Sequence, residues 1–238
     1  MKPNFIHFND LKKTTIDWDF HIHTLQTDGS SSIEEYIKCA QKRDIKKIAF
    51  TEHVRKTSSW YNSFVRNVED LRKKYSPPLT IYHGIETKIL NDDGDLDATD
   101  EMIQNAEIIL GSVHRFPEKK ENKSEIRQFI PEEFAEYEYY LAIAILKNHD
   151  VDVLAHPGGM YIQYYKADFP EIYLKQLIKT ANKYEKAIEI NSYYLRNSRF
   201  NINLFSKFNP KISLGSDAHN KKELGTVIQF ITEKIERM

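Results

Sequence analysis

Short apolar runs alternate with longer amphipathic segments along the whole chain of 238 residues, and this alternation limits the fold more than any other feature. The runs at 48–50 (Ile-Ala-Phe) and 108–110 (Ile-Ile-Leu) are apolar at every position, as in parallel strands covered on both faces. Seven units of strand followed by helix fit the pattern. Their regularity at this length favours a closed α/β barrel. An open doubly wound sheet is the alternative, although the chain has no Gly-rich phosphate turn.

The pattern predicts the bounds of the elements. Strands are expected at residues 15–20, 46–53, 79–86, 107–114, 151–157, 187–192 and 211–219. Helices are expected at residues 32–44, 61–75, 97–106, 131–149, 170–184, 200–208 and 222–238. Ser32 is the expected N-cap of the first helix.

Composition narrows the class of protein. Hydrophobic residues make up 40% and charged residues 29%, as in an ordinary globular protein, so we expect one domain over residues 1–238. Cys39 is the single cysteine, which excludes a disulfide within the chain and makes a cytoplasmic location the default expectation. No apolar run is long enough for a signal peptide or a membrane helix, so no membrane partner is expected. The net charge of -1 argues against a long nucleic acid as partner.

Residues that bind metals recur at the downstream ends of the expected strands. Six of the nine histidines stand there: His21, His23, His53, His114, His156 and His219. Three carboxylates hold equivalent places: Asp28, Glu86 and Asp217. In a β/α barrel these strand ends converge on one face, which holds the active site. We therefore expect the nine side chains to meet in one cleft, and the other histidines, at positions 7, 83 and 149, to lie outside it.

Each piece of this pattern also has a structural interpretation. A single histidine at a strand end is more often a hydrogen-bonded structural residue than a ligand. His21 and His23 differ, because side chains two positions apart on a strand point the same way. Imidazoles and carboxylates packed together are costly to desolvate unless a cation neutralises them. The set as a whole therefore predicts a metal site, and its mixture of imidazole and carboxylate suits Zn, Mn or Fe.

Seven segments resemble, in chain order, the motifs of the PHP (polymerase and histidinol phosphatase) superfamily. They are "DFHIHTLQTDG", "IAFTEH", "HGIETKI", "ILGSVH", "VLAHPGG", "IEINSYYLR" and "SLGSDAH", and the resemblance runs from about residue 17 to residue 219. It implies a distorted (βα)7 TIM-like barrel with a trinuclear metal centre at its C-terminal face. It assigns the first metal to His21, His23, Glu86 and Asp217, the second to Glu86, His114 and His156, and the third to Asp28, His53 and His219.

The resemblance also implies an activity, metal-dependent hydrolysis of a phosphate ester by water that the trinuclear centre activates, without a protein nucleophile. The segment 84–114 resembles that of the small stand-alone phosphatases of this family and that of the PHP domains of family-X DNA polymerases. The leading expectation for the substrate is a small phosphomonoester, with histidinol phosphate as one candidate. Arg196 matches an arginine that helps to bind the substrate phosphate in histidinol phosphatases. The chain departs from that motif at residues 192–194, where Ser-Tyr-Tyr replaces Thr-Ser-Gly.

Several alternatives remain open at this stage. The activity could instead be that of a phosphodiesterase or 3′-exonuclease on nucleotides, or the chain could be a non-enzymatic, metal-binding regulatory module.

Arg55 and Arg115 follow two of the strands and are either phosphate ligands or solvated loop charges. The charged segment 115–128 is either a lid or a plain loop. Tyr161, Tyr164 and Tyr165 either line a substrate pocket or pack under a loop. Glu52, beside His53, is expected to point away from the site. The oligomeric state is not predicted.

Overall fold

The computed structural model describes residues 2–117, 129–196 and 201–237. Eight strands form one sheet in the order β1-β8-β7-β6-β5-β4-β3-β2. Strands β2 to β8 pair in parallel, and β1 adds to the β8 edge in the antiparallel direction. The strands are β1 (Ile6–His7), β2 (Trp18–Ile22), β3 (Lys47–Val54), β4 (Thr80–Lys88), β5 (Ile108–Ser112), β6 (Val153–Leu154), β7 (Ala187–Asn191) and β8 (Lys211–Gly215).

The two ends of the parallel sheet meet without forming a full ladder. Ile22 makes an isolated parallel bridge with Ala218, just beyond the last strand. The His23 amide donates to the Ala218 carbonyl over 2.9 Å, and the Ala218 amide donates to the His21 carbonyl over 3.2 Å. The expected α/β barrel of seven strand–helix units is therefore confirmed in a distorted form, because the sheet stays open where β2 meets β8.

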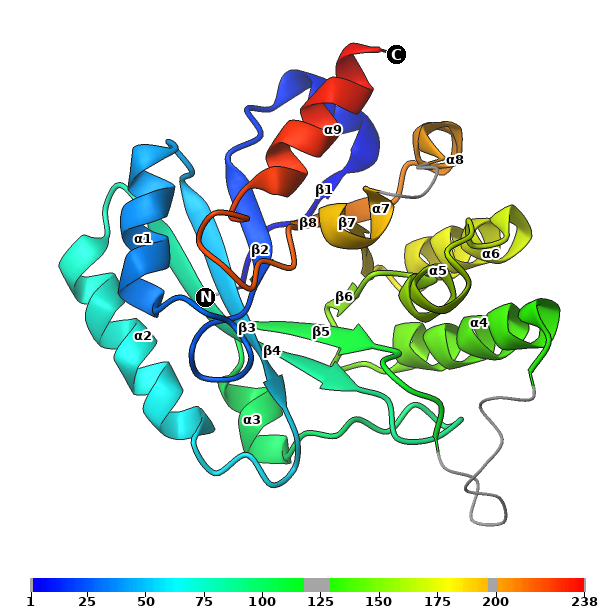
Figure 1. The fold of residues 1–238 in the computed structure, drawn as a ribbon, viewed down its shortest axis with the longest axis horizontal. Helices are drawn as coiled ribbons and strands as arrows, with labels where there is room; N and C mark the ends of the chain where they lie inside the picture. The colour runs from blue at the N-terminus through cyan, green and yellow to red at the C-terminus, as the bar shows by residue number, and fades with distance from the viewer. Residues whose placement is uncertain (1, 118–128, 197–200, 238) are drawn as a thin grey trace.

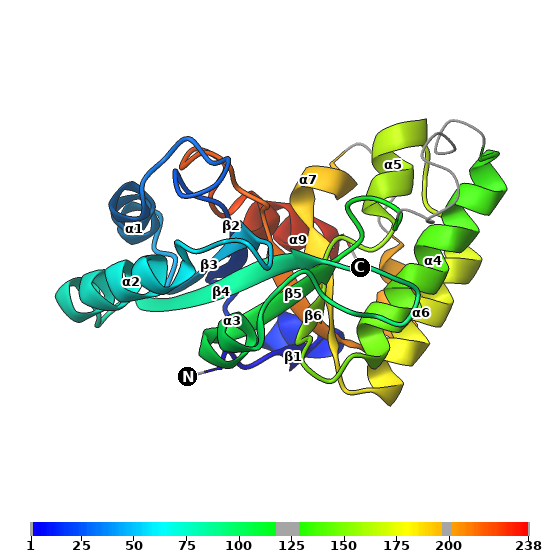
Figure 2. The same ribbon diagram turned by 90° about the horizontal axis from the view of Figure 1, so that it is seen from below.

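Helices surround these strands (Figure 1). They are η1 (Phe8–Lys13, a 3-10 helix), α1 (Ile33–Lys42), α2 (Tyr61–Tyr75), α3 (Asp100–Asn105), α4 (Pro131–Lys147), α5 (Gly159–Tyr165), α6 (Glu171–Lys183), α7 (Ser192–Leu195), α8 (Ile202–Phe208) and α9 (Thr226–Glu236). Figure 2 shows α1 and α2 on one side of the strands and α4, α5 and α6 on the other.

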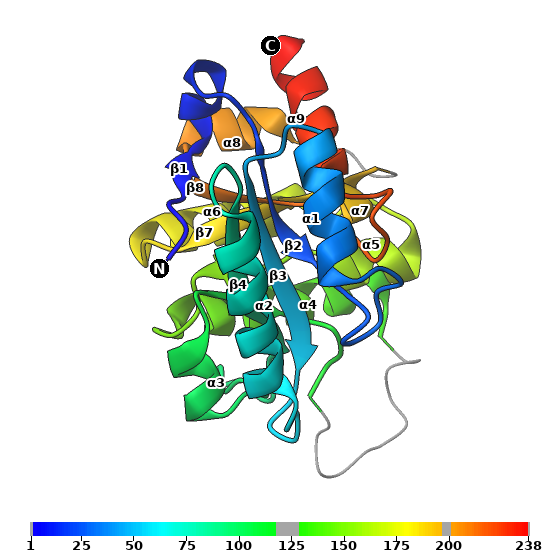
Figure 3. The ribbon, with the colours of Figure 1, turned by 90° about the vertical axis from the view of Figure 1, so that its left-hand side faces the viewer.

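The first helix shows how the sequence pattern becomes structure. Ser32 caps α1 through a capping box, in which its side chain accepts from the Glu35 amide and the Glu35 carboxylate accepts in return. The apolar residues at helical spacing, Ile33, Tyr36 and Ile37, are buried together with Ala40. The helix lies side by side with α2 against the strands (Figure 3). The expected N-cap and the expected buried face are both confirmed.

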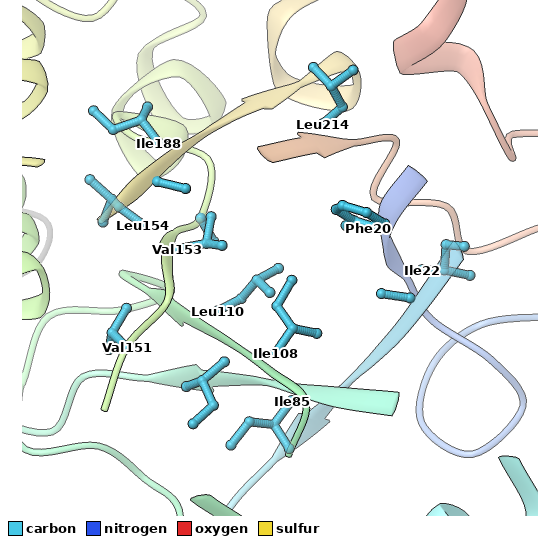
Figure 4. Close-up of a cluster of buried hydrophobic side chains, with 14 of the residues drawn as sticks. Phe20, Ile22, Ile85, Ile108, Leu110, Val151, Val153, Leu154, Ile188 and Leu214 are labelled. Atoms are coloured by element: carbon cyan, nitrogen blue, oxygen red, sulfur yellow. The ribbon is translucent and has the colours of Figure 1, made fainter. Parts of the chain in front are cut away.

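The core lies on both faces of the sheet, as the apolar strands predicted. Every residue of β2, β5 and β7 is buried. Leu110 of β5 pairs with Val153 of β6, and both lie in the cluster shown in Figure 4. Ile108 is fully buried there, and it fills the space that opens where Gly84 of β4 lacks a side chain. This packing fixes the ends of the strands relative to one another.

Four short elements were not expected from the sequence. Strand β1 has two residues, and only its pairing with β8 makes it a strand. It leads into η1. Helix α5 was expected to be a loop, and it starts after Gly158 in the left-handed region, at φ 78°. Helix α7 has four residues, and the Asn191 side chain caps it. Each is too short for a periodic pattern to be visible in the sequence.

Among the described residues, no helix is both long and apolar enough to cross a membrane.

The central packing predicts the stability of two isoleucine variants. Ile108→Ala leaves a cavity in the core, so the free energy of unfolding falls by about 2–5 kcal/mol. Ile172→Ala is the matched control, because this side chain is 65% exposed, and we expect a change within about 0.5 kcal/mol. Urea denaturation followed by circular dichroism measures both. Equal losses in the two variants would contradict the assignment of Ile108 to the core.

Candidate metal centre

The ends of strands β2 to β8 bring all nine expected ligands into one cluster. His21 and His23 show the effect of strand geometry most clearly. Their rings are fully buried on the same side of β2, with centroids 4.9 Å apart and their Nε2 atoms 3.0 Å apart. The period of two along a strand therefore places both rings in the barrel interior, as expected.

Glu86, at the end of β4, is the centre of the cluster. Its Oε1 lies 2.8 Å from the Nε2 atoms of both His114 and His156. Its Oε2 lies 2.9 Å from His53 Nδ1, and 3.3 Å and 3.5 Å from the Nε2 atoms of His21 and His23. One carboxylate thus faces five imidazoles.

The other two carboxylates complete the cluster. Asp217 Oδ1 lies 3.3 Å from His23 Nε2 and 3.6 Å from His21 Nε2. Asp28 Oδ2 lies 3.4 Å from His53 Nε2 and 3.3 Å from His219 Nε2. Asp28 is distant in sequence from both histidines, and the loop after β2 brings it to them.

These residues fit divalent metal ions. Three overlapping groups have ligand atoms within 4.8 Å of one another: His23, Asp28, His53 and His219; His21, His23 and Glu86; and His53, Glu86 and His114. Glu86 Oε2 is buried and, among the described residues, accepts no hydrogen bond of good geometry, although His53 Nδ1 lies 2.9 Å away. An unpaired buried carboxylate oxygen is costly, and a cation is the group that would satisfy it. The mixture of imidazole and carboxylate suits transition metals.

The charges in the cluster shift the pKa values of its members. Burial lowers the pKa of His23 to about 4, so this ring is neutral and its lone pair is free. For His53, burial opposes ionisation, but the charges of Glu86 and Asp28 outweigh it and raise the pKa to about 10. A hydrogen bond to Asp28 raises the pKa of His219 to about 9. Metal ions at this site therefore displace protons from His53 and His219.

Exposure varies across the cluster from one end to the other. The side chains of His21, His23 and Glu86 are at most 1% exposed. Those of His53, His114 and His219 are 34%, 33% and 38% exposed, and that of Asp28 is 53% exposed. The cluster therefore has a dry inner end and an open rim.

Two of the candidate ligands have unusual backbone angles. His156 has φ 28° and Asp217 has φ 52°, in the left-handed region that residues other than glycine seldom adopt. Such conformations persist only where the surrounding structure enforces them, and they occur often at functional sites. Both residues lie just after a short strand, where the chain turns to direct the side chain into the cluster.

Buried carboxylates hold several of the loops that carry the ligands. Glu189 of β7 lies 2.6 Å from His21 Nδ1 and accepts from the His156 amide over 2.7 Å. Asp19 of β2 accepts from the amides of Ser216 and Gly225, on both sides of the Asp217 loop. The sequence analysis missed both residues. A charged residue inside an otherwise apolar strand is the signal that could have found them, because such a charge is costly without partners.

Glu52 points away from the cluster, as expected. Its carboxylate accepts from the amide and hydroxyl of Thr24 and from the hydroxyl of Thr27. These bonds hold the loop that leads to Asp28. The three remaining histidines also lie elsewhere, with His7 beside Asn209, His83 beside Glu107 and His149 beside Asp150.

The three candidate phosphate-binding arginines are at the surface. The guanidinium of Arg196 stacks on the ring of Tyr193, 4.4 Å from its centroid. It borders a pocket between α7 and α9 that also contains Thr226 and Glu233. Arg55 and Arg115 are exposed beyond the ends of β3 and β5. A role in binding phosphate stays a prediction for all three.

The two expected features of the loops have different outcomes. Most of the possible lid at 115–128 lies outside the described residues. Tyr161, Tyr164 and Tyr165 belong to helix α5, where all three rings pack near the ring of Phe134. Aromatic packing, the second of the two alternatives, accounts for these contacts.

Comparisons with known proteins show which sequences this chain resembles. A family model described as PHP domain matches residues 19–193. A probable phosphatase of Caldicellulosiruptor bescii is 26% identical over 229 residues, which cover 92% of this chain and 86% of that protein. The DNA polymerase/3′-5′ exonuclease PolX of Bacillus subtilis is 28% identical over 226 residues, which cover 91% of this chain and 36% of the polymerase.

A solved structure shares the fold. The histidinol phosphate phosphatase of Lactococcus lactis subsp. lactis, determined with zinc, L-histidinol and phosphate, matches with a TM-score of 0.69. The match covers 93% of both chains at 18% sequence identity. Most of the present chain therefore follows the path of that fold.

A further buried carboxylate near the cluster, Glu138 of α4, predicts a pH dependence. It accepts from the amides of Met160 and Tyr161, and burial raises its pKa from 4.5 to about 7. Because the folded state favours the neutral form, the contribution of Glu138 to stability is complete below pH 4.5 and is lost as the pH rises through 7.

The variant Glu138→Gln removes this loss. Relative to wild type, its free energy of unfolding rises by up to about 3 kcal/mol between about pH 4.5 and about pH 8. Denaturation of both proteins with metal removed by a chelator measures the difference, and titration of the histidine cluster cancels because both proteins contain it. A difference that is constant with pH would contradict the assigned pKa shift.

Proposed function

The chain belongs to the PHP domain family, and on this premise we propose that it is a metal-dependent phosphatase that hydrolyses a small phosphomonoester. The proposal rests on one observation, the cluster of nine side chains centred on Glu86. All nine are histidine, aspartate or glutamate, which bind metal ions. The similarity to a probable phosphatase over 86% of its length supports the same activity.

The proposed ligands divide among three metal ions. His21, His23, Glu86 and Asp217 hold the first ion, Glu86, His114 and His156 the second, and Asp28, His53 and His219 the third. The contacts of Glu86 support a bridging place between the first two ions, because its Oε1 lies 2.8 Å from His114 and His156 Nε2 and its Oε2 lies 3.3 Å and 3.5 Å from His21 and His23 Nε2. His53 Nδ1, assigned to the third ion, also lies 2.9 Å from Oε2. Zinc, manganese and iron all suit these donors.

The chemistry of hydrolysis comes from the metals together with the shape of the site. The residues of the cluster would hold divalent ions, which would supply an acidified water molecule as the nucleophile and would neutralise charge on the phosphoryl oxygens. Burial of His21, His23 and Glu86 excludes bulk water from the inner end, which strengthens electrostatic interactions there. The substrate enters over the exposed rim formed by Asp28, His53, His114 and His219. No serine, cysteine or aspartate acts as a protein nucleophile.

Arg196 is the proposed ligand of the substrate phosphate, with Arg55 and Arg115 as further candidates. A guanidinium binds two phosphate oxygens at once. Arg196 follows helix α7, and its neighbour Tyr194 packs on the ring of His156 with centroids 4.7 Å apart. This contact between the α7 segment and a candidate ligand supports a place for the arginine beside the site.

Histidinol phosphate is one candidate substrate, since the Lactococcus lactis enzyme of the same fold was solved with L-histidinol and phosphate. Tyr193 and Tyr194 stand where the histidinol phosphatase motif has serine and glycine, and Tyr194 is partly buried beside His156. Two bulky rings reduce the space for a leaving group at this wall. The proposed substrates therefore also include phosphomonoesters whose alcohol differs in shape from histidinol.

A second candidate function is that of a phosphodiesterase or 3′-exonuclease on nucleotides. The similarity to the polymerase/exonuclease of Bacillus subtilis favours it. The net charge of -1 is a counter-argument for long nucleic acids but not for short nucleotides. A non-enzymatic metal-binding module is disfavoured by the complete set of ligand-type residues.

Model esters distinguish these functions. With manganese or zinc added, the protein hydrolyses p-nitrophenyl phosphate faster than bis(p-nitrophenyl) phosphate, and a screen of phosphorylated metabolites, histidinol phosphate included, then identifies the substrate. Faster hydrolysis of the bis-ester would favour the diesterase. No turnover of either ester with metals bound would contradict an enzymatic function.

A matched pair of histidine variants tests the site. His114 lies at the exposed rim, so we expect His114→Ala to fold. Loss of a residue that only supports a metal ligand costs roughly 10–100-fold in activity, and loss of a ligand itself costs at least as much. We therefore expect kcat/KM of His114→Ala to fall by at least this factor. His149→Ala is the control, because that side chain is 91% exposed beside Asp150, and we expect wild-type rates. Wild-type rates in His114→Ala would contradict the ligand assignment.

A further inference from the structure

Glu189 is a buried charged residue that the proposed ligand set leaves out. It lies in the middle of β7 and is 1% exposed. Its Oε1 lies 2.6 Å from His21 Nδ1. Its Oε2 accepts from the His156 amide over 2.7 Å and from Asn191 Nδ2 over 3.1 Å. One carboxylate thus joins two candidate ligands that lie on different strands.

The bond to His21 determines which nitrogen of this ring carries the proton. A carboxylate is an acceptor only, so the short contact requires the proton on Nδ1. His21 Nε2 is then the nitrogen that a metal ion would bind, on the side where Glu86 Oε2 lies 3.3 Å away and Asp217 Oδ1 lies 3.6 Å away. A histidine that binds metal through one nitrogen commonly has the other bonded to a carboxylate, which fixes the tautomer and the ring orientation.

Gly215 of the neighbouring strand β8 provides the space for this pair. A Cβ atom at position 215 would lie 2.0 Å from Glu189 Oε1 and 2.6 Å from His21 Cβ, closer than atoms approach. Gly215 is not among the residues with positive φ, so its backbone angles do not require glycine. The close approach of Glu189 and His21 is the physical reason for glycine here.

We propose that Glu189 is a positioning residue of the metal centre, which holds His21 as the Nδ1–H tautomer with Nε2 toward the metal, in a space that Gly215 keeps open. By accepting from the His156 amide, Glu189 also fixes the turn that directs His156 toward Glu86. The inference rests on the proposed function in one respect, that the cluster binds divalent metal. The inference adds that Glu189, which does not touch the metal, contributes to the metal affinity.

The variant Glu189→Gln tests the role with little change in shape. Glutamine has one acceptor oxygen where glutamate has two, so it cannot satisfy both His21 Nδ1–H and the His156 amide. We expect the affinity for zinc to fall by about 10–100-fold, the usual cost of losing the outer partner of a metal ligand. Titration of the metal-free protein with zinc against a chromophoric chelator measures this without any enzymatic assay.

Two further variants show whether the effect is specific. Gly215→Ala displaces the same carboxylate without removing it, so it also weakens zinc binding, and the double variant with Glu189→Gln loses less than the product of the single losses. Glu138→Gln is the matched control, because it changes another buried carboxylate that accepts from two backbone amides. Within the described residues, this carboxylate makes no hydrogen bond to a candidate ligand. We expect wild-type zinc affinity in that protein.

A spectroscopic signature separates positioning from a general loss of stability. In ¹H–¹⁵N spectra of the histidine rings of the zinc-loaded protein, His21 shows a protonated Nδ1 in wild type. This signal is shifted or lost in Glu189→Gln, while the other ring signals stay in place.

The outcomes distinguish the inference from the function on which it rests. Weaker zinc binding in Glu189→Gln and Gly215→Ala, with wild-type affinity in Glu138→Gln, supports the inference. Unchanged affinity and an unchanged His21 signal in Glu189→Gln would overturn it and leave the proposed function standing. An equal loss in Glu138→Gln would overturn it as well, because any buried carboxylate would then have the same effect. Failure of the wild type to bind zinc or manganese would overturn the proposed function itself.

Discussion

The structure depends on one buried carboxylate that faces five imidazoles. Glu86 is 1% exposed at the end of β4, and each of its oxygens lies within 3.5 Å of at least two histidine nitrogens. Such a group is costly inside a protein unless its charge is balanced. Part of the balance comes from protons on histidines such as His53, whose pKa is raised to about 10 by Glu86 and Asp28 against the effect of burial. A set of metal ions would balance it without protons, and for this reason the arrangement is best understood as a metal centre.

The remaining polar groups of the interior serve to hold this arrangement. The strands bring the ligands together, but several ligands lie on loops beyond the strand ends. The loops at Asp28, at His156 and at Asp217 and His219 are tied by carboxylates that accept backbone amides. Glu52 holds the loop before Asp28, Glu189 the turn at His156, Asp19 the segment around Asp217, and Glu223 the amide of His219. Two of these bonds, from the amides of His156 and Ser216, lie at or beside the residues with left-handed backbone, His156 and Asp217. The site is therefore organised in two layers of carboxylates, one facing the histidines and one facing the backbone.

Much of this could be predicted from the sequence, because it follows from local periodicity. Helix α2 spans the expected residues, and the strand ends carry the expected histidines, since apolar runs and their polar ends are visible in the chain itself. The roles of Asp19 and Glu189 could not be predicted in the same way, because they depend on which residues of other strands lie beside them. The same is true of Gly215, whose need for glycine is apparent only when Glu189 and His21 are seen next to it. Short elements such as α5 and α7 were missed because they are set by caps and tertiary contacts rather than by a repeating pattern.

The central claim is that the nine clustered side chains bind several metal ions at once. Anomalous diffraction from crystals grown with zinc, recorded on both sides of the zinc absorption edge, tests it most directly. The account predicts three peaks, each within coordination distance of its assigned ligands, with Glu86 between two of them. The absence of any peak among these residues, in crystals whose zinc lies elsewhere or not at all, would contradict it.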